Sequence, residues 1–306
     1  MAMDKFNDIA IFIQAAQNQS FSIAARQLGM SPSAVSKALQ RLEEHLEVRL
    51  FNRTTRSLSL TEDGAAFHDR CRQILDELEE AEQELSKSRS IPTGTLRLDL
   101  TIELGRLHII PALPTFIAQY PDLKLDVTFS NRMIDLVEEG IDAVVRIGSG
   151  PDSQLIMHRL ATARLIVCAA PTYLIRYGEP EIPEDLMNHN CLTFVSQHTG
   201  RIFEWSFQRH GQEFHLPING NLRLSHGEAL LEVAIRGIGL VQLHNYLAGA
   251  AIAQGKLKPV LESYAISGAP ISVVYPQKRH LSAKVRAFVD FMTELMTQLR
   301  QDNIVE

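Results

Sequence analysis

Polar side chains suited to nucleic-acid contacts gather between residues 31 and 41. They lie away from the apolar stripe of a predicted helix: Ser33, Ser36, Lys37, Gln40 and Arg41. Short hydroxyls allow close approach to a DNA major groove, and the amide and cations reach base edges or phosphates. A single polar helix face is more often merely solvated, so the flanking segments must decide between these interpretations.

Those segments predict two helices joined by a short turn. Phe6 to Ala16 follow helical spacing, and Ser22 is placed to cap a second helix that ends at Leu28, before Gly29. Ser31 followed by proline begins a third helix, which runs to about His45. Its apolar stripe is Val35, Leu39, Leu42 and Leu46. This is a helix-turn-helix pattern, and it favours DNA binding over a solvated face.

A short hairpin is predicted directly after the third helix, over residues 50–60. Phe51, Leu58 and Leu60 are its expected anchors, and its tip carries Arg53 and Arg56. Arginine at a hairpin tip suits a narrow minor groove or flanking phosphates. The net charge of -6 does not argue against this. Charge is uneven, and residues 26–56 hold the basic side chains Arg26, Lys37, Arg41, Arg49, Arg53 and Arg56 against Glu43, Glu44 and Glu47.

Composition limits the class of protein. With 306 residues, 45% hydrophobic and 22% charged, the chain suits a globular protein of more than one domain. Its first residues do not resemble a signal peptide, and no run of eighteen apolar residues occurs, so we expect a cytoplasmic protein without a membrane segment. Cys71, Cys168 and Cys191 form no CxxC pair, and no histidine pair has metal-ligand spacing with an acid, so neither a metal nor a cofactor is expected.

The run SFSIAARQLGMSPSAVSKALQRLEEHLEVRLFNRTTRSLSLTEDG, residues 20–64, resembles the DNA-binding domain of LysR-type transcriptional regulators. The resemblance implies a winged helix-turn-helix domain over residues 1–60. It also implies DNA contacts from Ser31, Ser33, Ser36, Lys37, Arg53 and Arg56, to which the helix face adds Gln40.

A linker helix is predicted over residues 61–90. Thr61 is its cap, with Glu62 and Asp63 in the first turn, where they favour the positive end of the helix dipole. Apolar residues then recur in steps of four and three: Phe67, Cys71, Ile74, Leu78, Ala81 and Leu85. Such a seam packs either on its own domain or on a second copy, and its regularity favours the second copy. The resemblance implies a homodimer that assembles into a homotetramer.

Strands and helices alternate from residue 95 onward. Strands are predicted at 96–100, 123–129 and 143–147, with helices at 105–120 and 134–139, which gives a parallel sheet with crossover helices. A second lobe begins near Leu165, and the chain returns to the first through a strand at 271–275 and a helix at 282–300. The fold class is therefore α/β with two lobes. Lobe I takes residues 94–162 and 269–302, and lobe II takes residues 163–268.

This region resembles the periplasmic-binding-protein-like effector domain of the same family, most clearly over residues 129–148, 232–247, 254–261 and 279–291. The resemblance places a small-molecule effector between the lobes, at Thr101, Ile102, Glu103, Ser130, Arg146, Ser196, Ser225 and His226. Hydroxyls and backbone N–H groups there suit a polar or anionic ligand. Glu103 would repel a carboxylate unless Arg146 or Arg106 neutralises it, or else it lies on the surface.

Two other classes of protein fit the sequence poorly. The chain lacks GxSxG, GxxxxGK[ST], HExxH and a strand-linked GxGxxG, so we do not expect an enzyme. A bare solute-binding protein would not carry a DNA-binding arm. The expected partners are double-stranded promoter DNA and the effector, with RNA polymerase a further partner to consider. Cys168 and Cys191 lie in apolar strands, where buried inert thiols are favoured over a redox pair.

Overall fold

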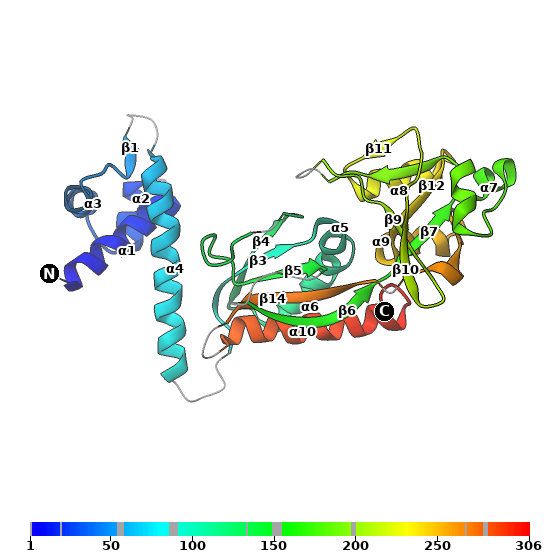
Figure 1. Cartoon of the computed structure of the whole chain (residues 1–306). Helices are drawn as coiled ribbons and strands as arrows, with labels where there is room; N and C mark the ends of the chain where they lie inside the picture. The colour runs from blue at the N-terminus through cyan, green and yellow to red at the C-terminus, as the bar shows by residue number, and fades with distance from the viewer. Residues whose placement is uncertain are drawn as a thin grey trace. The chain divides into compact units, whose positions relative to one another are not determined.

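A computed structural model describes residues 2–18, 20–53, 58–85, 91–132, 134–148, 155–196, 200–266, 268–277 and 281–306. The chain divides into two compact units, Met1–Ser90 and Ile91–Glu306 (Figure 1). Among the described helices, none combines the length and apolarity that crossing a lipid bilayer requires.

Three helices and a two-stranded wing make up most of the first unit. These elements are α1 (Ala2–Asn18), α2 (Phe21–Gln27), α3 (Pro32–Leu46), β1 (Phe51–Arg53) and β2 (Leu58–Leu60). Gly29 has φ 64° in the turn after α2, and Ser31 caps α3, both as predicted. The cap of α2 was predicted wrongly. Ser20 and not Ser22 begins this helix, because the Ser20 hydroxyl accepts the N–H of Ile23 at 3.3 Å.

The core of this unit lies where the three helices meet the wing. Phe12, Val35, Leu39 and Leu42 are buried together, and Phe51 joins them with its ring centroid 5.4 Å from that of Phe12. Leu46, Leu58 and Leu60 pack against this cluster while staying partly exposed. The predicted apolar stripe of α3 and the predicted anchors of the wing therefore pack in one core. This shared core fixes α3 relative to the wing.

Helix α4 (Glu62–Leu85) begins as predicted, with the Thr61 hydroxyl accepting the N–H of Gly64 at 2.9 Å. A Cβ added to Gly64 would lie 2.0 Å from the carbonyl oxygen of Leu50, so only glycine fits there. The apolar seam predicted for α4 has two different environments. Phe67 and Cys71 pack on the core of their own chain, whereas Ile74 and Leu78 are each 48% exposed. Ala81 and Leu85 have side chains outside the described set.

The second unit contains two five-stranded sheets. The first has the order β4-β3-β5-β14-β6. Its strands are β3 (Gly94–Leu100), β4 (Leu123–Phe129), β5 (Ala143–Ile147), β6 (Leu155–Ala163) and β14 (Ala269–Pro276). β3 runs parallel to β4 and β5, whereas β14 runs antiparallel to β5 and β6. The carboxyl ends of β3, β4 and β5 therefore meet at one edge, where ligands of such sheets bind.

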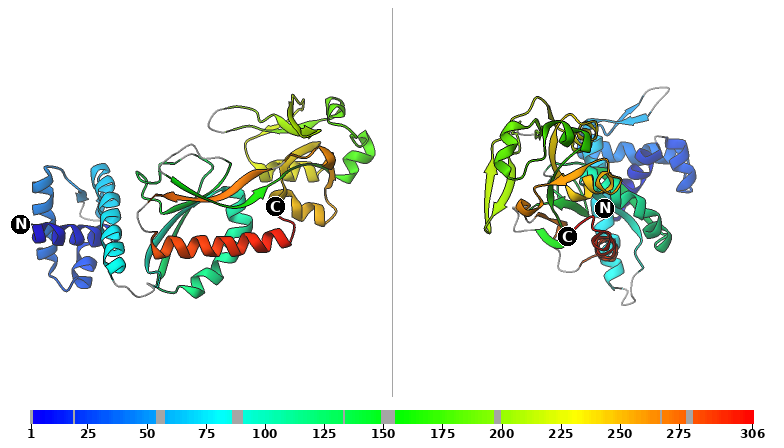
Figure 2. Two further views of the ribbon diagram at one scale, coloured as in Figure 1. Left: turned by 60° about the horizontal axis from the view of Figure 1, so that its bottom comes forward. Right: turned by 90° about the vertical axis from the view of Figure 1, so that its right-hand side faces the viewer.

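The helix after β3 starts three residues earlier than predicted. It consists of α5 (Ile102–Leu104), a π turn η1 (Gly105–Ile109) and α6 (Ile110–Gln119). Pro111 has no N–H to donate, which removes an α-helical hydrogen bond just after the π turn. The rings of α6 pack on α10 (Ala283–Gln301), with Phe116 4.9 Å from Phe291. Figures 1 and 2 show α10 along one face of the sheet.

The predicted helix at 134–139 is not formed. Residues 136–140 make a single hydrogen-bonded turn, closed by Gly140 at φ 64°. The carboxylate of Asp135 accepts the N–H groups of Val137 and Glu138 at 2.9 and 3.0 Å. These bonds from the backbone to the Asp135 side chain favour a local turn over a regular helix.

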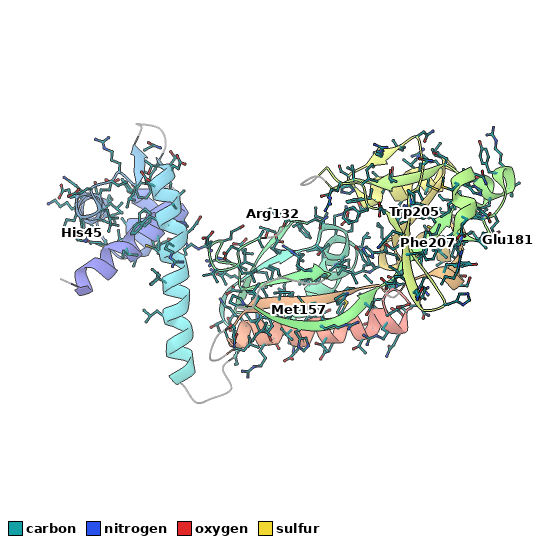
Figure 3. All side chains as sticks on the ribbon, in the orientation of Figure 1. His45, Arg132, Met157, Glu181, Trp205 and Phe207 are labelled. Atoms are coloured by element: carbon teal, nitrogen blue, oxygen red, sulfur yellow. The ribbon has the colours of Figure 1, made fainter. Side chains whose placement is uncertain are left out.

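The second sheet has the order β11-β8-β12-β7-β13. Its strands are β7 (Leu165–Ala169), β8 (Cys191–Phe194), β11 (Arg223–Leu224), β12 (Leu240–His244) and β13 (Lys258–Val260). The accompanying elements are α7 (Pro171–Tyr177), η2 (Pro183–Asn188), α8 (Gly227–Ile235), α9 (Asn245–Ala253), η3 (Glu262–Tyr264) and the hairpin β9 (Trp205–Arg209) with β10 (Gln212–Leu216). Trp205 and Phe207 are buried side chains of this hairpin (Figure 3). One apolar core extends through both sheets.

Candidate functional site

The exposed face of α3 presents polar groups opposite its buried stripe. Ser33, Lys37 and Gln40 are exposed, and Ser36 is half-buried, while Val35 on the other side is fully buried. The amphipathic spacing of the helix therefore holds hydroxyl, ammonium and amide groups outward on a rigid element. Such an arrangement can hydrogen-bond to base edges and attract phosphates.

Several of these predicted DNA contacts already have partners within α3. The Ser31 hydroxyl accepts the N–H of Ala34 at 3.2 Å and lies 3.0 Å from the Ser33 hydroxyl. The Gln40 amide donates to Glu44 at 2.9 Å. Ser31 therefore fixes the start of the helix, whereas the flexible Gln40 contact is exposed and can be exchanged for a ligand.

Arg41 lies on the same side of α3, but it has a structural partner. Its guanidinium donates to both carboxylate oxygens of Asp8 on α1, at 2.6 and 3.2 Å. Asp8 is buried, so this pair ties α3 to α1. Arg53 lies in β1 opposite Leu58, and its side chain, like all of Arg56, lies outside the described set.

In the second unit, the predicted effector residues of lobe I collect at the carboxyl ends of β3, β4 and β5. Buried Asp99 holds two of them. Its carboxylate pairs with Arg146 and accepts a hydrogen bond from Ser130 at 2.9 Å. It also accepts from Thr128 at 2.7 Å. The Thr101 hydroxyl donates to the carbonyl of Val145 at 2.8 Å. Ser130 and Arg146 are thus brought together as predicted, but by a carboxylate of the chain itself.

Glu103 is buried, with 7% of its surface exposed. It lies in α5 and faces the beginning of α8, where it is 3.4 Å from the backbone N–H of Gly227. The Asn131 amide donates to it at 3.4 Å, and the same Asn131 side chain accepts the N–H of Ile102 at 3.2 Å. Of the two positions left open for Glu103, surface or interior, the structure shows the interior.

A second contact joins η1, which follows α5 directly, to α8. Arg106 pairs with Glu228, and the hydrogen bond and the charge of that carboxylate raise the pKa of the guanidinium. His226, a predicted effector residue, is the N-cap of α8 and is half-buried. Ser196 and Ser225 follow the paired strands β8 and β11, so they lie at one end of the second sheet.

Aromatic and imidazole rings complete this region. His244 stacks on Tyr246 with ring centroids 5.3 Å apart, and His108 of η1 lies 2.8 Å from the carbonyl of Tyr246. Burial lowers the pKa of His244, although the charge of Glu103 acts in the opposite direction. Burial and Glu103 together raise the pKa of Tyr246. His244 is therefore neutral at pH 7.

Comparisons with known proteins address both units. Residues 6–65 match the model of the bacterial regulatory helix-turn-helix protein, lysR family, and residues 89–297 match that of the LysR substrate binding domain. The chain belongs to the LysR family of transcriptional regulators. It is a DNA-binding regulator with an effector-binding domain, and not an enzyme.

Individual LysR-type relatives cover nearly the whole chain. An uncharacterized HTH-type transcriptional regulator of Haemophilus influenzae is 38% identical over 92% of this chain and 98% of its own. The regulator CrgA of Neisseria meningitidis is 37% identical over 94% and 95%. The solved structure of CrgA matches with a TM-score of 0.60 at 34% identity, covering 95% of this chain and 98% of that one.

The cysteines of this LysR-type regulator lie in its apolar cores. All three are buried and free, and burial raises the pKa of Cys168 and of Cys191 to about 12. The thiolate, which is the reactive form, is therefore disfavoured at both positions. The interpretation as inert thiols agrees with this environment.

Two residues of this region were not predicted from the sequence to belong to it. Asp99 alternates with leucines in LRLDL and so looks like a solvent-facing strand residue. His244 ends β12 in an apolar run without any local signal. Asp99 is buried in β3, which lies between β4 and β5 in the sheet. His244 is half-buried where β12 meets α9.

Proposed function

We propose that this LysR-type regulator binds promoter DNA as a dimer, with α3 in the major groove and the wing against the flanking backbone. The observation that carries the proposal is the face of α3, where Ser33, Lys37 and Gln40 are exposed opposite a fully buried stripe. Ser36 and the arginines Arg53 and Arg56 complete the set of contacts that we infer. The bases are read by the short hydroxyls and Gln40, and the cations bind phosphates.

The dimer in this proposal forms through α4. Ile74 and Leu78 are each 48% exposed and lie one turn apart on the same side of the helix. Large apolar side chains left in water at helical spacing favour a second helix as their partner. Two such dimers would form a homotetramer, which acts in the cytoplasm on RNA polymerase at the promoter.

The effector in this proposal is a small polar molecule that binds at the carboxyl ends of β3, β4 and β5, against α8. Contacts from both lobes support this position, because Glu103 and Arg106 of the first lobe touch Gly227 and Glu228 of the second. A ligand that exchanges with such contacts changes the relation between the lobes. Thr101, Ile102, Ser130, Arg146, Ser196, Ser225 and His226 form the remainder of the inferred site.

A gel shift tests the central part of this proposal. The full-length chain is titrated against the DNA upstream of its own gene, in a large excess of unrelated competitor DNA. We expect a retarded band that survives the competitor, because specific sites typically bind at least about 10³-fold more tightly than other sequences. Equal loss of the band with the specific and the unrelated fragment would contradict sequence-specific binding.

A further inference from the structure

Glu103 is a buried carboxylate with few hydrogen bonds. A carboxylate can accept about four hydrogen bonds, and a buried one usually has several short ones. Its two contacts, to the Gly227 N–H and the Asn131 amide, are both 3.4 Å long, which is near the limit for a hydrogen bond. Glu103 thus retains unused acceptor capacity in a desolvated position.

Other buried acceptors lie on the elements that Glu103 faces. Glu228 Oε1 and Asn245 Oδ1 have no donor, at the beginnings of α8 and α9. His244 uses one ring nitrogen on the backbone of Ala163, and its Nδ1 is also without a donor. These statements hold for the part of the chain that the structure describes. Acceptors gathered in this way call for a ligand that brings several N–H groups.

The net charge of this cluster is negative. Glu103 and Glu228 both lie near the guanidinium of Arg106, which already pairs with Glu228. Arg146, one of the two cations that could have neutralised Glu103, pairs instead with Asp99. A buried excess of negative charge favours a ligand of positive charge.

The position that would attract an anion is occupied by the chain itself. Backbone N–H groups at a helix N-terminus favour negative charge, and the Glu103 carboxylate takes this place at α8. A Cβ at position 227 would lie 3.0 Å from Leu247 and 3.3 Å from Glu103, so glycine permits the close approach. A carboxylate ligand would meet Glu103 instead of free N–H groups.

We propose that the effector site takes a small organic cation, whose protonated amine or amidine group donates to Glu103 and to the neighbouring acceptors of α8 and α9. This inference rests on the proposed function, and it replaces the anionic class of ligand that hydroxyls and backbone N–H groups alone would favour.

Paired probe compounds of similar size and opposite charge test the proposal on the full-length chain. Benzylamine, benzamidine and butylamine are titrated beside benzoate and butyrate, with the melting temperature and calorimetric heat as readouts. We expect at least one of the cations to bind, and Glu103→Gln to weaken its binding at least tenfold. Glu213→Gln, which removes an exposed carboxylate of β10, is the matched control and should bind the cation as the wild type does.

A measurement without ligand keeps the proposal testable if the probes are too small to bind. Because the Glu103 charge is buried with few partners, Glu103→Gln should raise the melting temperature of the free protein by about 2 °C or more. A lower melting temperature would overturn the proposal, since it would show that the chain alone satisfies the carboxylate. Binding of benzoate but not of benzylamine by the wild type would overturn it equally.

The gel shift separates failure of this inference from failure of the proposed function. If the chain retards its DNA specifically while only carboxylates bind, the regulator function stands and the cationic class of effector is wrong. If a cation binds through Glu103 but no DNA is retarded, the ligand class stands and the proposed function is wrong.

Discussion

The outer face of α3 and the strand-end cluster of the second unit use polar residues in opposite ways. On α3, Ser33 and Lys37 remain exposed, and the contacts they could make are left to a ligand. At the strand ends, Asp99 and Glu103 are buried, and Asp99 already holds Arg146 and Ser130. A surface for a large hydrated polyanion needs free groups. A site for a small molecule needs groups whose positions and charges are fixed beforehand.

The largest effect is expected where a buried pair is broken. Asp99→Asn leaves the mostly buried Arg146 without its carboxylate, and we expect the second unit to lose about 3–5 kcal/mol of unfolding free energy. Denaturant unfolding measures this loss. Asp126→Asn removes an exposed carboxylate from β4 of the same sheet and should change stability little. Similar stability of the two variants would contradict the view that buried Asp99 fixes the strand-end cluster.

The next largest effect concerns the exposed apolar residues of α4. Leu78→Asp places a charge where we expect a second copy of the helix, at a cost on the order of several kcal/mol per dimer. Light scattering should show the mass falling toward the 34.3 kDa of one chain. Ile175→Asp, at a position 86% exposed in α7, is the control and should leave the mass unchanged. An unaltered mass for Leu78→Asp would refute the α4 dimer.

A smaller effect is expected on α3. Ser33→Ala and Ser36→Ala should each reduce the discrimination between specific and unrelated DNA by about 1 kcal/mol, because short hydroxyls there reach base edges. The melting temperature should stay unchanged, since neither hydroxyl supports the core. Ser263→Ala, exposed in η3, provides the comparison in competition gel shifts. Full discrimination in both α3 variants would remove these hydroxyls from the inferred contacts.

The smallest effect is a change in the pH dependence of stability. The pKa of His244 is lowered by burial, so the unfolded chain binds its proton more tightly than the folded one. Stability from this group is therefore full above pH 6.5, the ordinary histidine value, and is lost as pH falls below it toward the folded pKa. Melting curves from pH 7.5 to 5.5 should fall less steeply for His244→Gln than for the wild type. Parallel curves would contradict a buried neutral imidazole.

Local signals in the sequence were sufficient for much of the first unit. Ser31 before proline, Gly29 and Thr61 act through bonds to residues at most a few positions away, so their roles could be predicted. The cap of α2 was predicted two residues too late, at Ser22 instead of Ser20, because local spacing does not fix the first residue of a short helix. The seam of α4 was predicted to pack on a second copy along its whole length. Its regular spacing does not reveal that Cys71 packs on its own chain.

The effector region depended on contacts between distant parts of the chain. The resemblance led to Ser130 and Arg146, but strand pairing decides that Asp99 holds both. The sequence alone did not decide whether Glu103 is exposed or buried, because its partner Gly227 lies 124 residues away.

The salt dependence of DNA binding tests the assignment of α3 most directly. Affinity for the upstream DNA is measured over a range of salt concentrations for the wild type, for Lys37→Ala and for Lys256→Ala, an exposed lysine of the second unit. If Lys37 binds a phosphate, its loss should weaken binding to all sequences and lower the slope of log affinity against log salt by about one. Lys256→Ala should match the wild type. An unchanged slope and affinity for Lys37→Ala would contradict the placement of α3 against DNA.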